Sequence, residues 1–151
     1  MNYVENIRRK IGHDPLILVG SNVIIEKDGK ILLQKRSNGN WGLPGGLMEI
    51  GETLEHTAVR EVYEESNLEI SNLKLINLYS GNDYSFTLKN NDQINVVTAL
   101  YYTNQFEGVM NTNNDETLDL KFVDPKELPF ETEQEYVTYI NDYIKKVEKF
   151  S

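Results

Sequence analysis

Segments rich in Leu, Ile, Val and aromatic residues alternate along this chain with polar turns. Six of them are typical of strands: Leu16–Glu26, Ile31–Arg36, Leu68–Leu78, Tyr84–Leu88, Ile94–Thr103 and Leu118–Val123. The connection Lys27–Lys30 contains Asp-Gly, a strong hairpin signal, so we expect the first two strands to pair. Helical patterns cover Met1–Ile11, Thr53–Ser66 and Glu133–Glu148, of which the second is the clearest.

The order of these elements predicts the class of fold. Strands, one central helix, more strands and a closing helix favour an α/β fold, a mixed sheet with helices packed on its faces. The chain has 151 residues and neither an internal repeat nor a linker, so we expect a single domain over residues 1–151. Ser37–Gly51 contains five of the ten glycines and Pro44, which predicts a shaped loop.

Composition limits the classes of partner. The chain carries 24 acidic and 15 basic side chains, a net charge of −9, which disfavours long polyanions, so we expect no nucleic-acid partner. A small phosphorylated substrate stays compatible if cations screen the contact. No apolar run approaches the roughly 20 residues that cross a bilayer, so no membrane partner is expected. With no cysteine and no signal-peptide pattern at the N-terminus, the default expectation is a cytoplasmic protein.

The central helix contains the residues most suited to chemistry. At about 100° per residue, Glu61, Glu64 and Glu65 fall within roughly 100° of one another. Ala58 and Val62 lie beside them and can bury the adjoining face. Three carboxylates at the edge of a packed surface repel one another, and a hard divalent cation offsets that repulsion. Magnesium fits because it prefers oxygen ligands and keeps water and substrate phosphates in its shell.

The loop before this helix adds further candidates. Its glycines allow a close approach of the main chain to a ligand, and a carbonyl of Gly45 or Gly46 could supply a neutral metal ligand. Glu52 lies at the start of the helix, where the helix dipole favours an anion that accepts N–H bonds from the loop. We therefore assign Glu52 mainly to holding the loop. Arg60 is a single counter-ion for the three glutamates.

The stretch Gly46–Leu68 resembles the Nudix box. That motif is a glycine, five residues, a glutamate, seven residues, then Arg-Glu-apolar-any-Glu-Glu-any-Gly-apolar. The matching positions are Gly46, Glu52, Arg60, Glu61, Val62, Glu64, Glu65 and Leu68. Asn67 stands where the family has glycine, and because asparagine also adopts the left-handed conformation that ends helices, we expect the turn to be kept. Leu32–Arg36, Trp41–Gly46 and Glu116 also resemble flanking Nudix features in their expected order.

This resemblance implies a Nudix-type α/β/α sandwich with a central mixed β-sheet. It also implies a Mg²⁺- or Mn²⁺-dependent attack of water on a nucleoside diphosphate linked to another moiety. Glu61 and Glu65 would be metal ligands, with Glu64 the next, and Arg60 would orient these carboxylates. Glu116 would be a general base or a further ligand, and an exposed loop acid is the equal alternative. A homodimer is compatible with the resemblance.

Three residues before the box are candidate substrate contacts. Arg36 ends a strand and is either a phosphate contact or a surface charge. Trp41 stacks on a base or, more commonly for a lone tryptophan, packs in the core. Gly45 allows the main chain to approach the substrate closely. Tyr84 lies where the dinucleoside-polyphosphate branch of the family has a tyrosine, although tyrosine is also common in strands.

Three functions therefore compete. The first is hydrolysis of small nucleotides: nucleotide sugars including ADP-ribose, dinucleoside polyphosphates, or nucleoside triphosphates. The second is removal of pyrophosphate from RNA ends, which the acidic charge disfavours. The third is a non-catalytic Nudix-like domain that senses a nucleotide or binds a partner. Such domains usually lose box glutamates, and this chain retains them all, which favours an enzyme.

Overall fold

A computed structural model describes residues 2–150, so the predictions that include Met1 and Ser151 are assessed without those two residues. The central mixed sheet follows the order β10-β2-β1-β8-β6. Its strands are β1 (Leu16–Lys27), β2 (Lys30–Arg36), β6 (Lys74–Tyr79), β8 (Gln93–Thr103) and β10 (Thr117–Val123). Three short strands extend it: β3 (Trp41–Gly42) on β2, β4 (Gly45–Leu47) on β1 and β7 (Ser85–Thr87) on β8.

The pairing of β1 makes the sheet mixed. It pairs in parallel with β8 over ten residues, from Leu16 opposite Ile94 to Ile25 opposite Thr103, and antiparallel with β2 and β4. The predicted hairpin between β1 and β2 is present. Asp28 and Gly29 both have positive φ, 53° and 81°, as the favoured two-residue hairpin turn requires.

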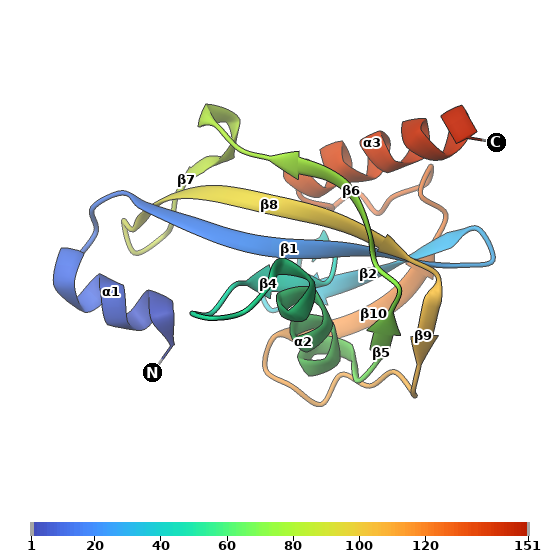
Figure 1. Cartoon of the computed structure of the whole chain (residues 1–151), viewed down its shortest axis with the longest axis horizontal. Coiled ribbons are helices and arrows are strands. Elements are labelled where there is room, and N and C mark those ends of the chain that lie inside the picture. Colours follow the sequence, from blue (N-terminus) through green and yellow to red (C-terminus); the bar gives the residue numbers. More distant parts are fainter. Residues whose placement is uncertain (1, 151) are drawn as a thin grey trace.

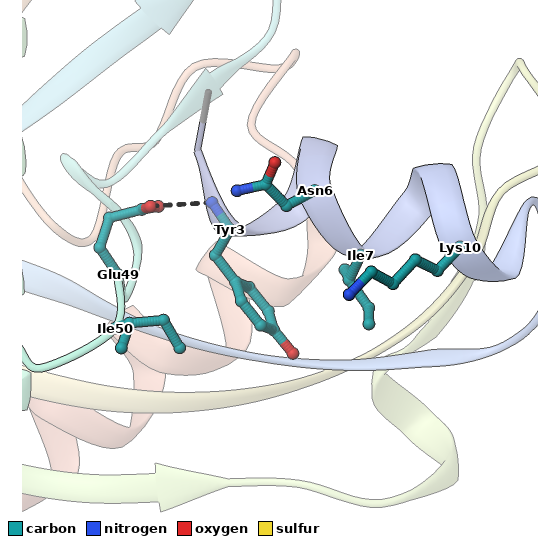
Figure 2. A pocket seen from close by; sticks show the side chains of 6 residues that line it. All are labelled: Tyr3, Asn6, Ile7, Lys10, Glu49 and Ile50. Carbon is teal, nitrogen blue, oxygen red and sulfur yellow. Dashed lines mark hydrogen bonds between the residues drawn. The ribbon is translucent and has the colours of Figure 1, made fainter.

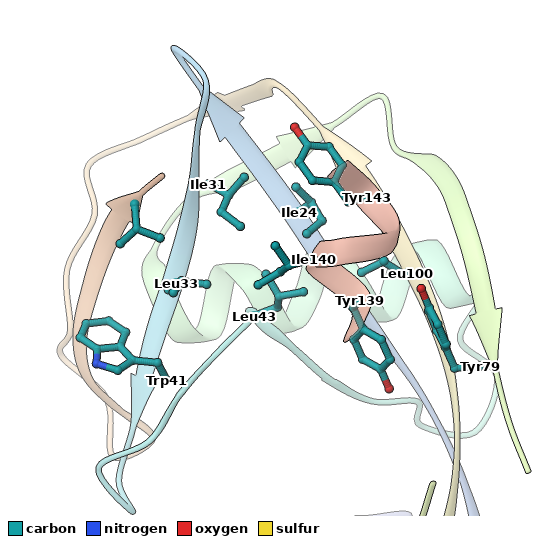
Figure 3. Packing of buried hydrophobic residues seen from close by; sticks show 11 residues of the cluster. Ile24, Ile31, Leu33, Trp41, Leu43, Tyr79, Leu100, Tyr139, Ile140 and Tyr143 are labelled. Carbon is teal, nitrogen blue, oxygen red and sulfur yellow. The ribbon is translucent and has the colours of Figure 1, made fainter. Parts of the chain in front are cut away.

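Two helices cover opposite faces of the sheet, α2 (Leu54–Ser66) and α3 (Gln134–Phe150) (Figure 1). Side chains along a strand point alternately to the two faces, which separates Ile24 from Val23 and Ile25. Ile24 packs in the cluster that includes Tyr139 and Ile140 of α3 (Figure 3). Val23 and Ile25 pack in the cluster that includes Ala58 and Val62 of α2. The result is the predicted α/β/α sandwich.

The strand predicted over Leu68–Leu78 is wrong as one element. It divides into β5 (Glu69–Ser71) and β6, and β5 pairs instead with β9 (Gln105–Glu107) in a separate two-stranded sheet. The break falls at Asn72, whose φ is +55°. A left-handed residue cannot continue a strand, so the chain turns there and changes sheets.

Smaller differences concern lengths and ends. The strand predicted to start at Tyr84 begins instead at Ser85, because Asn82–Tyr84 forms a single 3₁₀ turn, η1. The shaped loop Ser37–Gly51 contains the short strands β3 and β4. The predicted closing helix corresponds to α3, which begins one residue later and extends two residues further.

The helix α1 (Tyr3–Ile11) lies beside the sheet and has no buried residue (Figure 1). Gly12 ends it, with φ of +63° and its N–H donated to the Arg8 carbonyl. A cavity of about 430 Å³ lies between α1 and the loop that precedes α2. The Tyr3 N–H donates across it to Glu49 Oε1 at 3.0 Å (Figure 2). Among the described residues, no helix is both long and apolar enough to cross a membrane.

Candidate active site

The site is built around α2, whose start is fixed by two side chains that accept hydrogen bonds from main-chain N–H groups. Thr53 caps the helix by accepting a bond from the His56 N–H at 3.0 Å. Glu52 Oε1 accepts from the Glu49 N–H at 2.8 Å, so Glu52 holds the preceding loop against the helix. Hydrogen bonds from Arg60, with a smaller contribution from Glu49, lower the pKa of Glu52 to about 2.

Arg60 joins this start to the rest of the acidic face. Its Nε and Nη2 donate to the two oxygens of Glu52 at 2.6 and 2.8 Å, a two-point pairing that fixes the guanidinium plane. Nη1 donates to Glu61 Oε1 at 2.8 Å and lies 3.4 Å from Glu64 Oε2. Nη2 also donates to the Leu47 carbonyl at 3.1 Å. One cation therefore orients Glu61 and binds the loop.

Glu61 also belongs to a group of three carboxylates that lie close together. Ligand oxygens of Glu61, Glu65 and Glu116 all lie within 4.8 Å of one another. Glu65 comes from the buried face of α2, Glu61 from its half-buried flank, and Glu116 from the exposed segment before β10. We call Glu61, Glu65 and Glu116 the carboxylate cluster.

Glu64 is not part of this cluster, contrary to the sequence-based expectation of three helix carboxylates. Glu61 and Glu65 are four residues apart and stack on one face of the helix. Glu64 points to the other side of Glu61, and its side chain is 55 % exposed and faces Arg60. Glu116 takes the third place instead.

Glu65 is the least accessible member of the cluster, with 1 % exposure. Its Oε1 accepts from the Gly45 N–H at 2.9 Å, and its Oε2 lies 3.8 Å from Arg36 Nη1. Burial raises the pKa of Glu65 to about 8. Within residues 2–150, Oε2 has no hydrogen-bond partner. A buried acceptor without a donor is costly, and either a proton or a cation beside Glu61 and Glu116 would satisfy it.

The two glycines of β4 make room for this arrangement. A Cβ atom on Gly46 would lie 2.4 Å from the carboxyl carbon of Glu61. Gly45 has φ of +146°, and a Cβ atom there would lie 2.1 Å from the Ser21 carbonyl. The main chain of Gly46 therefore lies directly against Glu61 of the cluster, and that of Gly45 lies against Ser21.

The end of α2 is fixed by the one departure from the motif. Asn67 adopts the left-handed conformation, with φ of 68° and ψ of 11°, and its N–H donates to the Tyr63 carbonyl at 2.8 Å. Its side-chain Nδ2 donates to the Val109 carbonyl at 2.9 Å, which a glycine could not do. Earlier on the same helix, the pKa of Glu61 is raised, and burial of its carboxyl group is the main cause.

A cavity of about 440 Å³ adjoins the site and is bounded by Gly45, Gly46 and Arg36. One wall is apolar and comes from the β7–β8 region: Phe86, Leu88, Ile94 and Val96. It is also lined by Glu133, which precedes α3, and by Glu135, Tyr136 and Tyr139 of α3. These residues carry no sequence signal for function, because nothing in their local pattern shows that β7, β8 and α3 meet beside the box.

Arg36 connects the cavity with the cluster. Its Nη2 donates to the Leu43 carbonyl at 2.9 Å and to Tyr136 Oη at 3.2 Å, while Nη1 faces Glu65. Trp41 is 8 % exposed and packs in the core, which agrees with the packing interpretation of this residue (Figure 3). Of the three predicted substrate contacts, Arg36 and Gly45 line the cavity.

Comparison with known proteins agrees with this geometry. A family model described as the NUDIX domain matches residues 18–143, which include the whole site from Arg36 to Tyr136. This chain belongs to the Nudix hydrolase family. An ADP-ribose pyrophosphatase of Methanocaldococcus jannaschii is 33 % identical to this Nudix chain over 126 residues, which are 81 % of this chain and 70 % of the relative.

Two further comparisons differ in how much they cover. The crystal structure of a MutT NUDIX hydrolase from Burkholderia pseudomallei superposes with a TM-score of 0.73 and 26 % identity, over 84 % of this chain and 98 % of that one. An NAD-capped RNA hydrolase of Photorhabdus laumondii is 45 % identical over 65 residues. That match covers 41 % of this chain but only 24 % of the relative, so this chain corresponds to a part of it.

Proposed function

We propose that this Nudix hydrolase cleaves the phosphoanhydride bond of a nucleoside diphosphate linked to another moiety, with a divalent cation, Mg²⁺ or Mn²⁺, at the carboxylate cluster. The observation that supports this most is the convergence of Glu61, Glu65 and Glu116 around a buried oxygen for which the described residues supply no donor, beside a cavity. In an ordinary group of surface acids, all the carboxylates are exposed, whereas Glu65 of this cluster is buried.

The donor set fits a hard cation. Three carboxylates supply oxygen ligands only, and Glu116 is exposed, which leaves room for water and substrate phosphates. The main chain of Gly46 adjoins Glu61 and is the predicted neutral ligand. When bound, the cation supplies Lewis-acid stabilisation of the phosphates and lowers the pKa of a coordinated water.

The residues of the chain account for the remaining steps. The apolar wall of the cavity receives the nucleoside, and Arg36, which also lines the cavity, binds the phosphates. In the reaction, a water oxygen bonds to phosphorus, the bridging P–O bond breaks, and the two products leave as phosphates. The proton of that water passes to a carboxylate. Glu116 is suited to accept it on the carboxylate oxygen that does not hold the cation, because it is exposed and lies in the cluster, whereas Glu64 is exposed but lies outside it.

Among the substrates, ADP-ribose and similar nucleotide sugars come first, because the relative from Methanocaldococcus jannaschii is named for that activity. The resemblance of Tyr84 to the dinucleoside-polyphosphate branch has a structural alternative, since Tyr84 packs against Tyr79 at 5.8 Å between ring centroids. RNA ends are disfavoured by the net charge of −9.

The test is phosphate release from a panel of nucleotides, with a coupled phosphatase and with Mg²⁺ or Mn²⁺. The panel holds ADP-ribose, other nucleotide sugars, dinucleoside polyphosphates and nucleoside triphosphates. We expect one class to turn over, and Glu65→Gln to lower kcat by about 10³-fold or more, because it removes a charge that the cation and its water require.

Glu64→Gln is the matched control, since it makes the same change one residue away on the exposed side of α2. We expect it to lower kcat by less than about tenfold. Full activity of Glu65→Gln would refute the assignment of the cluster. Nucleotide binding without turnover of any compound would instead support the non-catalytic sensing domain.

A further inference from the structure

The position of Glu116 needs an explanation, because it lies in a segment without regular structure. β9 ends at Glu107 and β10 begins at Thr117, and the connection passes the C-terminal end of α2 (Figure 1). An exposed glutamate in such a connection would ordinarily move away from two other carboxylates, since like charges repel. A carboxylate oxygen of Glu116 nevertheless lies within 4.8 Å of those of Glu61 and Glu65.

The side chain of Asn114 joins the main chains of two cluster residues. Its Nδ2 donates to the Glu65 carbonyl at 3.0 Å. Its Oδ1 accepts from the Glu116 N–H at 3.0 Å. The amide therefore bridges the buried ligand and the exposed one, and both bonds go to main-chain atoms, so they leave the two carboxylates free.

The Glu65 carbonyl has a reason to accept this bond. It belongs to the last turn of α2, where the carbonyls lack partners within the helix. Thr117 Oγ1 also donates to it at 3.0 Å, and buried Gln34 donates to Thr117 Oγ1 at 2.8 Å. Thr117 thus fixes the start of β10, while Asn114 reaches the residue that carries the exposed ligand.

Other contacts hold the same connection at a distance from Glu116. The Asn111 N–H donates to the Ser66 carbonyl at 3.1 Å, and Asn67 Nδ2 binds the Val109 carbonyl. These bonds anchor the first half of the segment on α2. The amide of Asn114 acts on the second half, directly at the ligand.

We propose that Asn114 is a positioning residue that holds Glu116 in the carboxylate cluster by linking its main chain to that of Glu65. This inference rests on the proposed cation site. Asn114 lowers the conformational freedom that Glu116 would lose on binding the cation, so its removal weakens binding without removing a ligand. Groups that orient metal ligands typically change metal affinity or activity by 10- to 100-fold.

The test compares Mn²⁺ binding, followed by electron paramagnetic resonance of the free ion, in the unchanged chain, Asn114→Ala, Asn113→Ala and Glu116→Gln. Asn113 is the matched control, because it is the neighbouring asparagine and its contact with Asn111 uses its main-chain N–H. We expect the Kd of Asn114→Ala to rise by about tenfold or more. We expect Asn113→Ala to bind as the unchanged chain does.

The outcomes separate the two proposals. If the unchanged chain binds no Mn²⁺, the cation site itself is wrong and this inference fails with it. If the unchanged chain binds Mn²⁺ and Asn114→Ala binds it equally well, the role of Asn114 alone is wrong. An unchanged Kd in Glu116→Gln would likewise refute the inference, since Asn114 would then position a residue that is no ligand.

A second measurement applies even if Asn114→Ala does not fold. In the unchanged chain without metal, the Glu116 amide hydrogen should exchange at least about tenfold more slowly than in an unfolded peptide, because it is held by Asn114 Oδ1. Exchange at the unfolded rate would overturn the proposal. In a folded Asn114→Ala protein, the same amide should lose its protection.

Discussion

At the scale of single residues, Arg60 interacts unequally with the glutamates around it. The guanidinium donates two hydrogen bonds to Glu52, which lies outside the cluster, and only one, at 2.8 Å, to Glu61. Glu52 therefore neutralises much of Arg60. The cluster therefore keeps more negative charge than its contact with Arg60 suggests, which favours a divalent ion there.

Glu52→Gln is expected to destabilise the fold in a pH-dependent way. The folded-state pKa of Glu52 is lowered to about 2 from an ordinary value of 4.5. Such a carboxylate contributes stability above pH 4.5, and the contribution is lost as the pH falls towards 2. At pH 7 the loss of charged hydrogen bonds should cost about 2 kcal/mol, measured by urea unfolding.

The difference between Glu52→Gln and the unchanged chain should shrink between pH 5 and pH 3. Glu55→Gln is the control, because Glu55 is an exposed acid in the first turn of the same helix. It should change stability by less than about 0.5 kcal/mol. A destabilisation by Glu52→Gln that is the same at pH 7 and pH 3 would show that the charge of Glu52 does not contribute.

Residue patterns predicted the helix face but not the ranking of its glutamates. Helical spacing predicted that Glu61, Glu64 and Glu65 lie on one face of the helix. In the structure, the exposed fraction is 1 % for Glu65 and 55 % for the side chain of Glu64. That difference depends on how α2 packs against β1 and β4, which spacing alone does not contain. Asn67 is the opposite case, because its left-handed conformation follows from the chemistry of asparagine.

At the scale of elements, α1 is attached by its ends rather than by a buried face. Arg8 donates to the carbonyls of Gly12, Asp14 and Gln93 at 2.9, 2.6 and 2.7 Å. At the other end, Tyr3 binds Glu49 in the loop before α2 (Figure 2). The helix therefore connects that loop with the start of β8. Residues next to the loop and next to the start of β8 line the cavity beside the carboxylate cluster.

Arg8→Ala is expected to raise KM for the nucleotide substrate about three- to tenfold and to leave kcat nearly unchanged. Without Arg8, the β7–β8 connection loses the hydrogen bond from Arg8 to the Gln93 carbonyl and the ion pair of Arg8 with Asp92, so the apolar wall is less well ordered before substrate binds. The carboxylate cluster is not touched, so the chemical step keeps its rate. Steady-state kinetics on the substrate found in the panel measure both constants.

Arg9→Ala is the matched control for this change, since Arg9 is the exposed neighbour on the same helix. It should alter neither constant by more than about twofold. A fall in kcat with unchanged KM in Arg8→Ala would contradict the role of α1 in ordering the cavity wall. It would indicate that the helix acts on the cluster through Glu49 instead.

The elements themselves were predictable where a long pattern defined them. β1, β8 and α2 each have enough residues for the period to appear, and all three were predicted within one or two residues of their ends. β9 has three residues, too few to show alternation, and its pairing with β5 depends on contacts distant in sequence. The break at Asn72 had a local signal, because asparagine favours positive φ, but an apolar run on both sides concealed it.

At the scale of the whole molecule, the sandwich was predictable and the cavity was not. Alternation along β1 and β8 creates two apolar faces, and two amphipathic helices are available to cover them. The cavity instead combines β4, the β7–β8 region and the start of α3, which meet only after the chain has folded. Folding also brings together the carboxylates of Glu61, Glu65 and Glu116 in a chain that already carries a net charge of −9.

Millimolar Mg²⁺ or Mn²⁺ should therefore raise the melting temperature of the protein. The unfolded chain does not hold the three carboxylates together, so the ion binds the folded state preferentially and stabilises it. At 100 times Kd the stabilisation is about 2.7 kcal/mol, which for a chain of this size corresponds to a rise of about 5 to 10 °C. Differential scanning calorimetry measures the shift.

Two controls separate a specific site from general screening of the acidic surface. NaCl at equal ionic strength should give a much smaller rise, because screening acts on all exposed charges and the ion site needs coordination. Glu61→Gln should lose most of the rise with Mg²⁺, whereas Glu64→Gln should keep it, because the side chain of Glu64 faces solvent and Arg60. Equal rises in both variants would show that the ion acts through the net charge of the molecule and not through the carboxylate cluster.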